Sequence, residues 1–232
     1  MAPPCDTAPM RALVLLASLA MAILTACSTT SGSVPGGASN AVVAAAQKTR
    51  GASSYAFDLS LSVDGSTFPS RGEYQAPDRI RTTSVGGPSG TVPTTTIVIG
   101  DARYSSPPRS DGRWTELTVP GAGMFDLVQV LDIAARATDV THSSDGSYAF
   151  SSRTCSGAEV QGTARLSHDG YLSEVHTAFT IDGHETVMDQ SFSNFGAHVN
   201  IQPPDPSEVR SFGTMTPSST PGYLYPTATC IT

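Results

Sequence analysis

The sequence predicts a mainly β (α+β) domain built on one antiparallel sheet. Three observations support this prediction: runs that alternate between apolar and polar residues, Asp-Gly pairs between those runs, and few helical patterns. Asp-Gly pairs tolerate the positive φ of the two-residue turns that connect antiparallel strands. Because the runs follow one another as sequential hairpins, we expect one long meander and not a parallel sheet.

The strand pattern is clearest in residues 55–63, where Tyr55, Phe57, Leu59 and Leu61 alternate with small or polar residues. Asp-Gly pairs punctuate the chain at 64–65, 111–112, 145–146, 169–170 and 182–183. Some ten or eleven strands are predicted, the others being residues 71–74, 79–85, 94–99, 102–105, 113–119, 148–152, 159–167, 171–181, 185–192 and 198–201.

Two helices interrupt the strands. Residues 41–50 are alanine-rich, with Asn40 as the N-cap and Gly51 beyond the end. Residues 124–136 are amphipathic, and their apolar face carries Met124, Leu127, Val128, Leu131 and Ala135. The folded domain is predicted to end at residue 205. Residues 206–232 are rich in Pro, Ser and Thr and predict an extended tail, apart from a turn of helix at 206–210.

Residues 1–26 have the pattern of a secretion signal, with translation starting at Met10. Arg11 precedes an apolar run, residues 12–24, that is shorter than the roughly 20 residues of a spanning helix. The run ends in Leu-Thr-Ala-Cys27, which resembles the lipobox of bacterial lipoproteins, in which the Cys receives diacylglycerol. The alternative is an ordinary signal that happens to meet a cysteine. Lipidation of Cys27 predicts a chain anchored at the extracytoplasmic face of the cell membrane, with residues 28–40 as its flexible tether.

Cys155 and Cys230 remain beyond the anchor. Outside the cytoplasm an even pair of cysteines usually forms a disulfide, which would tie the tail to the middle of the domain. A loop of that length would stabilise the fold by about 4 kcal/mol in the chain-entropy model. Two free thiols, or intermolecular pairing by Cys230, are the alternatives.

Charge and motifs exclude several function classes. The net charge of −7 and the absence of a basic cluster argue against nucleic acid as a partner. No catalytic motif occurs, no cofactor is expected, and the five histidines lack metal-ligand spacing, so no metal site is expected. Asp169 and Asp182 would need to face one cleft to act as an acid–base pair, whereas turn chemistry explains both. We therefore do not expect an enzyme.

A family resemblance covers about residues 40–205 and depends on the order of short motifs. These are the lipobox, the helix before residues 55–63, Gly112-Arg113-Trp114 ahead of the second helix, and the runs 162–167, 169–172, 191–196 and 199–203. In this order they resemble the LppX/LprG-type actinobacterial lipoproteins, within the wider LolA/LolB-like carriers. The resemblance implies an antiparallel half-barrel of about eleven strands, closed by two or three short helices around a hydrophobic cavity for acyl chains. The lipobox departs from LolA itself, which is unanchored, and the tail matches no family element.

The expected function is binding of the acyl chains of a lipid or lipidated glycan, for carriage within the cell envelope. The partners expected are that lipid, the membrane through the anchor, and an envelope transporter. Side chains of one parity on two strands and one helix would line the cavity, with the helix as a lid: Tyr55, Phe57, Leu59, Leu61, Leu127, Val128, Leu131, Val175, Phe179 and Ile181. A plain packed core is the alternative for these residues, and it would favour a surface lipoprotein that serves as a protein-docking or structural domain.

Overall fold

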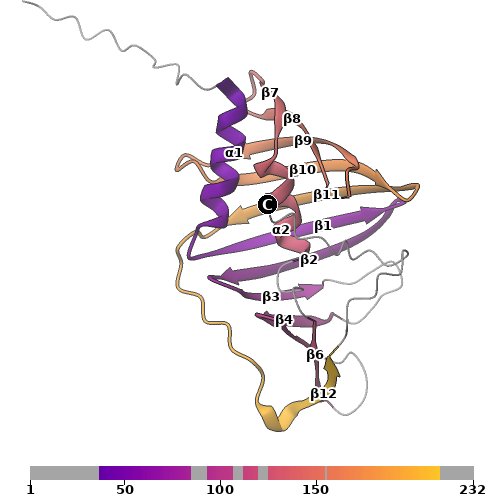
Figure 1. Ribbon diagram of the computed structural model, residues 1–232. Coiled ribbons are helices and arrows are strands. Elements are labelled where there is room, and N and C mark those ends of the chain that lie inside the picture. Colours follow the sequence, from indigo (N-terminus) through magenta and orange to yellow (C-terminus); the bar gives the residue numbers. More distant parts are fainter. Residues whose placement is uncertain (1–36, 85–92, 107–111, 120–124, 155, 215–232) are drawn as a thin grey trace, which may run out of the picture. The chain divides into compact units, whose positions relative to one another are not determined.

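Antiparallel hairpins assemble most of the chain into one sheet (Figure 1). The computed structural model describes residues 37–84, 93–106, 112–119, 125–154 and 156–214, all of which fall in one of the two compact units of the chain. The twelve strands lie in the order β12-β6-β5-β4-β3-β2-β1-β11-β10-β9-β8-β7, so β12 and β7 are edges and the sheet is open. The predicted antiparallel half-barrel is confirmed, with β12 added in parallel to β6. The single sequential meander is wrong: two meanders, β1 to β6 and β7 to β11, join through the pairing of β1 with β11.

The strands have these bounds: β1 Ser54–Val63, β2 Ser66–Gln75, β3 Arg79–Ser84, β4 Thr95–Ile99, β5 Ala102–Ser105, β6 Trp114–Thr118, β7 Thr138–His142, β8 Tyr148–Arg153, β9 Glu159–Leu166, β10 Leu172–Ile181, β11 His184–Ser193 and β12 Val209–Thr214. Strand β2 begins earlier than predicted and includes Pro69. Pro69 lies opposite Ser60 of β1, and the last described β2–β3 pair is Ser70 with Ser84.

Two Asp-Gly turns close neighbouring hairpins as predicted. Asp64 and Gly65 have φ of 48° and 78°, and Asp182 and Gly183 have φ of 52° and 84°. Positive φ at both positions matches the right-handed twist of the flanking strands. The two turns lie side by side because β1 pairs with β11, and the imidazole of His184 contacts the carboxylate of Asp64 at 2.6 Å.

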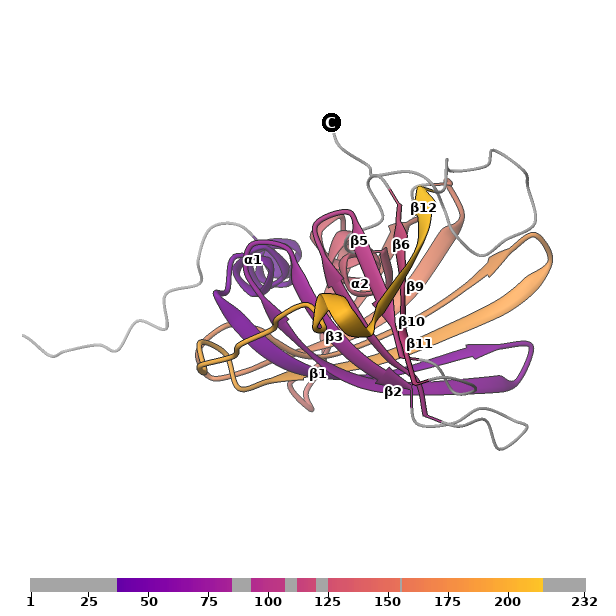
Figure 2. The same ribbon diagram turned by 90° about the horizontal axis from the view of Figure 1, so that it is seen from below.

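Two helices cover the same face of the sheet, which curves around them (Figure 2). Helix α1, Gly37–Arg50, contacts β7 to β10, and helix α2, Phe125–Ala135, packs beside α1 and against β8 and β10. An ion pair between Arg50 and Asp132 joins the two helices. No helix in these ranges is long and apolar enough to cross a membrane.

The helices differ from prediction in their bounds and in their buried faces. Helix α1 begins at Gly37 and not at residue 41, which shortens the predicted tether to residues 28–36. Helix α2 buries Val130, Ile133 and Ala134 in addition to Leu131 of the predicted face. The reason is that α2 has α1 on one side and strands on another, so more of its circumference is covered than a one-sided helix would show.

The chain after β11 corrects two further predictions. Residues 198–201 form no strand, and they run outside the sheet instead. Ile201 is fully buried there, its N–H donating to Gln75 Oε1 at 2.8 Å and its carbonyl accepting from Arg79 at 2.7 Å. Beyond it, a short 3₁₀ turn, Pro206–Glu208, leads into β12. The sheet therefore extends past residue 205, into the segment predicted as tail.

Candidate functional site

The concave face of the sheet, covered in part by α1 and α2, is the candidate site. Strand alternation and register place side chains from β1, β11 and β10 on this face in continuous rows: Phe57 opposite Phe192, Leu61 opposite Met188, and Phe179 opposite Thr186. The apolar members belong to one buried cluster shared with both helices.

Eight of the ten residues predicted to line a cavity come together on this face. Tyr55, Phe57, Leu131, Val175 and Phe179 are buried in the cluster, and Leu59, Leu61 and Ile181 are partly buried and pack against it. The side chains of Leu127 and Val128 lie outside the described part of the structure. The shared surface is thus present, while its use as a lipid cavity stays a prediction.

Burial of the concave-face side chains falls along β1, whereas Phe179, Thr186 and Met188 on the neighbouring strands stay buried near the same turns. At the end covered by the helices, Tyr55 and Phe57 are each 2 % exposed. Toward the Asp64-Gly65 and Asp182-Gly183 turns, Leu59, Leu61 and Ile181 become half-buried. Apolar surface is therefore left partly uncovered at the end of the face that lies farthest from α1 (Figure 1).

Aromatic rings fill the space above two strand glycines. A Cβ on Gly72 would lie 2.6 Å from the ring of Phe57, and a Cβ on Gly162 would overlap the ring of Phe150. The absent side chains let these rings lie flat against the sheet. Both glycines lie within predicted strands, but the strand pattern does not indicate that rings pack above them.

The helix-covered end carries an aromatic group around Tyr55. Its ring stacks on that of Tyr74 with centroids 4.8 Å apart, and the ring of Phe192 meets it edge-on. Burial raises the pKa of the Tyr55 phenol well above its ordinary value, and the neighbouring Tyr74 adds to the shift. Tyr55 is therefore a neutral core residue at any physiological pH.

Two polar side chains lie within the apolar face and find no hydrogen-bond partner in the described chain. They are Thr177, which is fully buried, and Gln190, which is 3 % exposed. Other buried hydroxyls are partnered: Thr49 accepts from the Leu172 N–H at 2.9 Å, and Ser152 donates to the Ile133 carbonyl at 2.7 Å. An unpartnered buried polar group costs about 1–3 kcal/mol, so Thr177 and Gln190 call for a physical reason.

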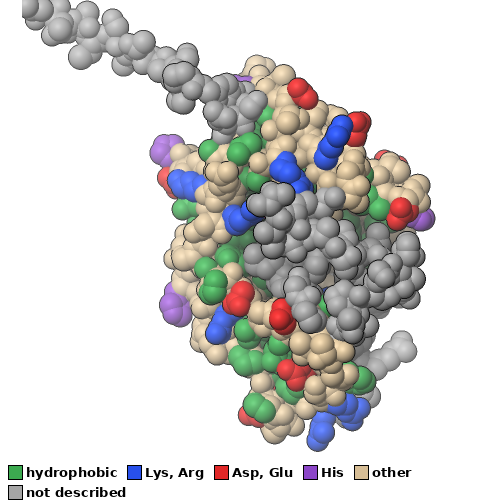
Figure 3. All heavy atoms as spheres, viewed as in Figure 1, with side chains coloured by type: hydrophobic (Ala, Val, Ile, Leu, Met, Phe, Trp, Pro, Cys, Tyr) green, Lys and Arg blue, Asp and Glu red, His purple; other side chains and the backbone are tan. Residues whose placement is uncertain are grey.

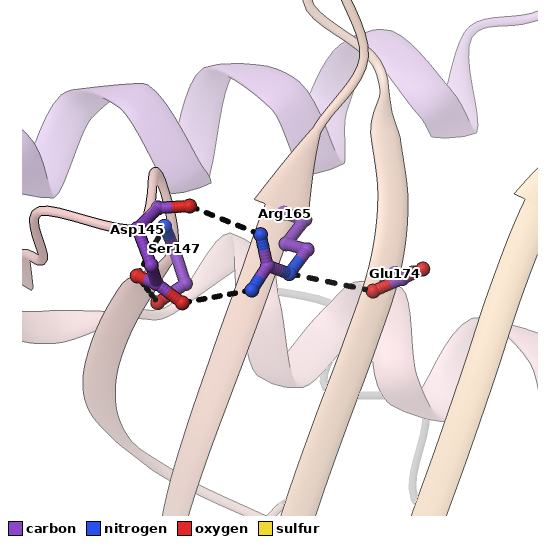
Figure 4. Close-up of polar contacts among 4 residues, drawn as sticks. All are labelled: Asp145, Ser147, Arg165 and Glu174. Carbon is purple, nitrogen blue, oxygen red and sulfur yellow. Dashed lines mark hydrogen bonds and ion pairs between the residues drawn. The ribbon is translucent and has the colours of Figure 1, made fainter.

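The convex face of the same strands carries charges that pair with one another. Arg165 donates to the Asp145 carboxylate at 2.8 Å and forms an ion pair with Glu174 at 3.6 Å (Figure 4). Hydrogen bonds from Ser147 hold the pKa of the Asp145 carboxyl below its ordinary value, and Arg165 adds to the effect. These groups are exposed, and such pairs contribute little stability.

Polar residues dominate the linings of two hollows on the described surface. A groove of about 790 Å³ lies along the convex face and includes Arg71, Arg165, His176 and Asp189. A second hollow of about 510 Å³ lies by β7, β8 and β9 and includes Arg136, Arg153 and Glu159. Neither has the apolar lining that was predicted for an acyl-chain cavity.

The weaker candidates from the sequence do not assemble into a site. All five histidines are exposed, and no three His, Cys, Asp or Glu side chains gather as metal ligands would among the residues described. Asp169 and Asp182 lie in the turns at opposite ends of β10, which is roughly 30 Å long, so they do not share a cleft. On the face seen in Figure 3, acidic and basic side chains are interspersed.

The covalent predictions concern residues outside the described ranges. Cys27, Cys155 and Cys230 all lie there, so lipidation and the disulfide stay predictions.

No family model and no curated protein matches the chain. Solved structures of similar architecture include LprF from Mycobacterium bovis, 15% identical, with a TM-score of 0.45 over 72% of this chain and 96% of that one. An uncharacterized conserved protein from Thermus thermophilus is 10% identical, with a TM-score of 0.46 over 75% and 99%. A putative outer membrane lipoprotein-sorting protein domain from Vibrio parahaemolyticus is 9% identical, with a TM-score of 0.32 over 71% and 95%.

Proposed function

We propose that this chain is a membrane-anchored, extracytoplasmic lipoprotein that binds the acyl chains of a lipid or lipidated glycan on the concave face of its sheet. Carriage of that lipid within the cell envelope is the role we infer. The observation that carries the proposal is the half-buried apolar end of the concave face, formed by Leu59, Leu61 and Ile181. Acyl chains suit such a surface because each buried methylene gains about 0.8 kcal/mol without directional contacts.

The proposed path of the ligand follows from the gradient of burial. An acyl chain enters at the end beside the two Asp-Gly turns, where the apolar side chains are partly covered, and extends toward the buried Val175 and Leu131. Helix α2 acts as the lid in this proposal. Its displacement from the sheet would open the space that the chain occupies.

A test of the proposal is the lipid content of the purified protein. We expect organic extracts of the mature chain with Cys27→Ser, which removes the acylated residue, to contain acyl lipid in near-stoichiometric amount by mass spectrometry. Folded protein that carries no lipid, and that takes up none from vesicles of its source membrane, would contradict the proposal.

One observation favours the alternative function, a surface lipoprotein that docks a protein. The hollows with described linings are polar, and the helix-covered end of the concave face is closely packed around Phe57 and Phe150. A surface lipoprotein that docks a protein needs no internal cavity. Absence of lipid from the folded chain is the result that would favour this function.

Anchoring is proposed through Cys27, and it has its own test. Residues 28–36 separate Cys27 from α1, and a chain of that length spans at most about 30 Å. The sheet would therefore stay close to the membrane surface. We expect Cys27→Ser to release the chain from the membrane fraction or to leave the precursor uncleaved, while the neighbouring change Ser28→Ala has no effect. Unchanged membrane association of Cys27→Ser would defeat the anchor.

A further inference from the structure

Thr177 and Gln190 are neighbours on the concave face. Gln190 of β11 lies opposite Val175 of β10, and Thr177 is two residues further along β10, so the two side chains form a diagonal pair. Diagonal partners on one face of an antiparallel pair lie about 7–8 Å apart, within reach of one ligand group. The pair sits beside Leu59, which is opposite Gln190 on β1.

The surroundings of this pair are apolar and uncharged. Along and across the strands, the positions next to Gln190 on the same face are Leu59, Val175, Met188 and Phe192, and Thr177 faces Met188 and Gly162. An ionised carboxylate or phosphate placed here would have no counter-charge among these neighbours. A neutral polar group would suit the site.

We propose that Gln190 and Thr177 form a polar subsite that hydrogen-bonds the neutral ester linkage of an acyl lipid bound on the concave face. This inference rests on the proposed function and specifies its ligand as an acyl ester, in contrast to a free fatty acid. The Gln190 amide donates through Nε2 to the ester carbonyl, and the Thr177 hydroxyl donates to the carbonyl of the second ester. The acyl chain then runs from the subsite over Leu59 and Leu61.

The lack of a partner in the described chain distinguishes this pair from the buried hydroxyls of Thr49 and Ser152. Thr49 and Ser152 each hold secondary structure together through a hydrogen bond to the backbone. Gln190 and Thr177 leave an amide nitrogen, an amide oxygen and a hydroxyl without a partner in the described chain. A ligand that bonds these atoms forms hydrogen bonds shielded from water. Without such a ligand, the unpartnered polar atoms destabilise the folded chain.

The test compares two probes that differ only at the linkage. Dipalmitoylglycerol has ester carbonyls, and its dihexadecyl ether analogue has the same chain length and the same free hydroxyl but no carbonyl. Gln190→Met and Thr177→Val remove the polar groups with little change in volume. Gln161→Met and Thr163→Val are matched controls on the exposed, opposite face of neighbouring β9.

We expect the wild-type chain to bind the ester about fivefold more tightly than the ether, as one net hydrogen bond would give. Each concave-face variant should lose that preference by weakening ester binding alone, and the controls should keep it. The Tm of the ligand-free variants should be no lower than that of wild type, because the change removes an unpartnered polar group. Equal, tight binding of both probes by wild type would overturn the subsite and leave the proposed function standing. A lowered Tm with equal loss of both probes would also overturn the subsite, and binding of neither probe by wild type would overturn the proposed function itself.

Discussion

The two faces of the strands β1, β11, β10 and β9 differ in how their polar groups find partners. On the convex face, Arg165 pairs with Asp145 and Glu174, and His176 contacts Asp189 at 2.6 Å, all in contact with solvent. On the concave face, two polar side chains are buried among apolar ones without a partner in the described chain. The same strands thus present one face whose polar groups are satisfied and one face whose polar groups are not.

This difference indicates where a ligand would add most. A molecule that lies on the convex face must displace water and compete with existing ion pairs, so its net gain is small. A molecule on the concave face can cover half-buried apolar side chains and satisfy buried polar atoms at once. We therefore propose binding on the concave face, although a groove of about 790 Å³ lies on the convex face.

The largest expected effect comes from truncating a buried ring. Phe57→Ala should destabilise the chain by about 3–5 kcal/mol, because it removes a ring that covers Gly72 and leaves a cavity in the cluster. Asp58→Ala, the next residue on the same strand, points to the convex face and should cost about 0.5 kcal/mol or less. Urea denaturation measures both values. Similar losses for the two variants would break the distinction between the faces.

A smaller loss is expected from filling the space above a glycine. Gly162→Ala should destabilise by about 1–3 kcal/mol, because its Cβ would overlap the ring of Phe150. Combining it with Phe150→Leu should cost less than the sum of the two single changes, since the smaller side chain makes room. A double-mutant cycle in denaturant measures this coupling. Strict additivity would show that the ring and the glycine do not constrain each other.

The smallest effect is expected at the two exposed Asp-Gly turns, where the hydrogen bond from His184 lowers the pKa of the Asp64 carboxyl below its ordinary value. A carboxyl with a lowered folded-state pKa stabilises the fold at pH values above its unfolded pKa, and that stabilisation disappears as the pH falls through the folded-state pKa. Asp64→Asn should therefore lower the Tm slightly at neutral pH and make no difference in strong acid. Asp58→Asn is the matched control. A difference in Tm between Asp64→Asn and wild type that persists in strong acid, below the folded-state pKa, would contradict this prediction.

The fold was predictable where local pattern and turn chemistry agree. The alternation of residues 55–63 predicts β1, and the Asp-Gly pairs predict the β1–β2 and β10–β11 hairpins. The pairing of β1 with β11 was not predicted, because it joins strands that lie far apart in the chain. Strand β12 was not predicted because its residues are mostly exposed and show no apolar alternation. It is a strand because it pairs with β6, which lies far earlier in the chain. The predicted strand at 198–201 is wrong because the apolar pattern there has another cause. Ile201 is buried against the domain without belonging to a strand.

The candidate site was predictable in part. Parity alone placed Tyr55, Phe57, Leu59 and Leu61 on one face, because strand side chains alternate. The polar pair was missed although the sequence contains its signal. Gln190 has the parity of Met188 and Phe192, so a polar residue stands where the pattern calls for an apolar one. Whether such a residue has a partner depends on packing, which the pattern does not specify.

The most direct test of the central claim is lipid content measured on a matched pair of tryptophan variants. Leu59→Trp places a bulky ring on the half-buried concave surface, and Ser60→Trp places the same ring on the convex face of the same strand. Mass spectrometry of organic extracts should show that Leu59→Trp loses co-purified acyl lipid with little change in Tm, while Ser60→Trp retains it. Equal lipid content in the two variants would contradict the proposal. So would a wild-type chain that carries no lipid together with a Leu59→Trp variant that is destabilised by about 1–3 kcal/mol.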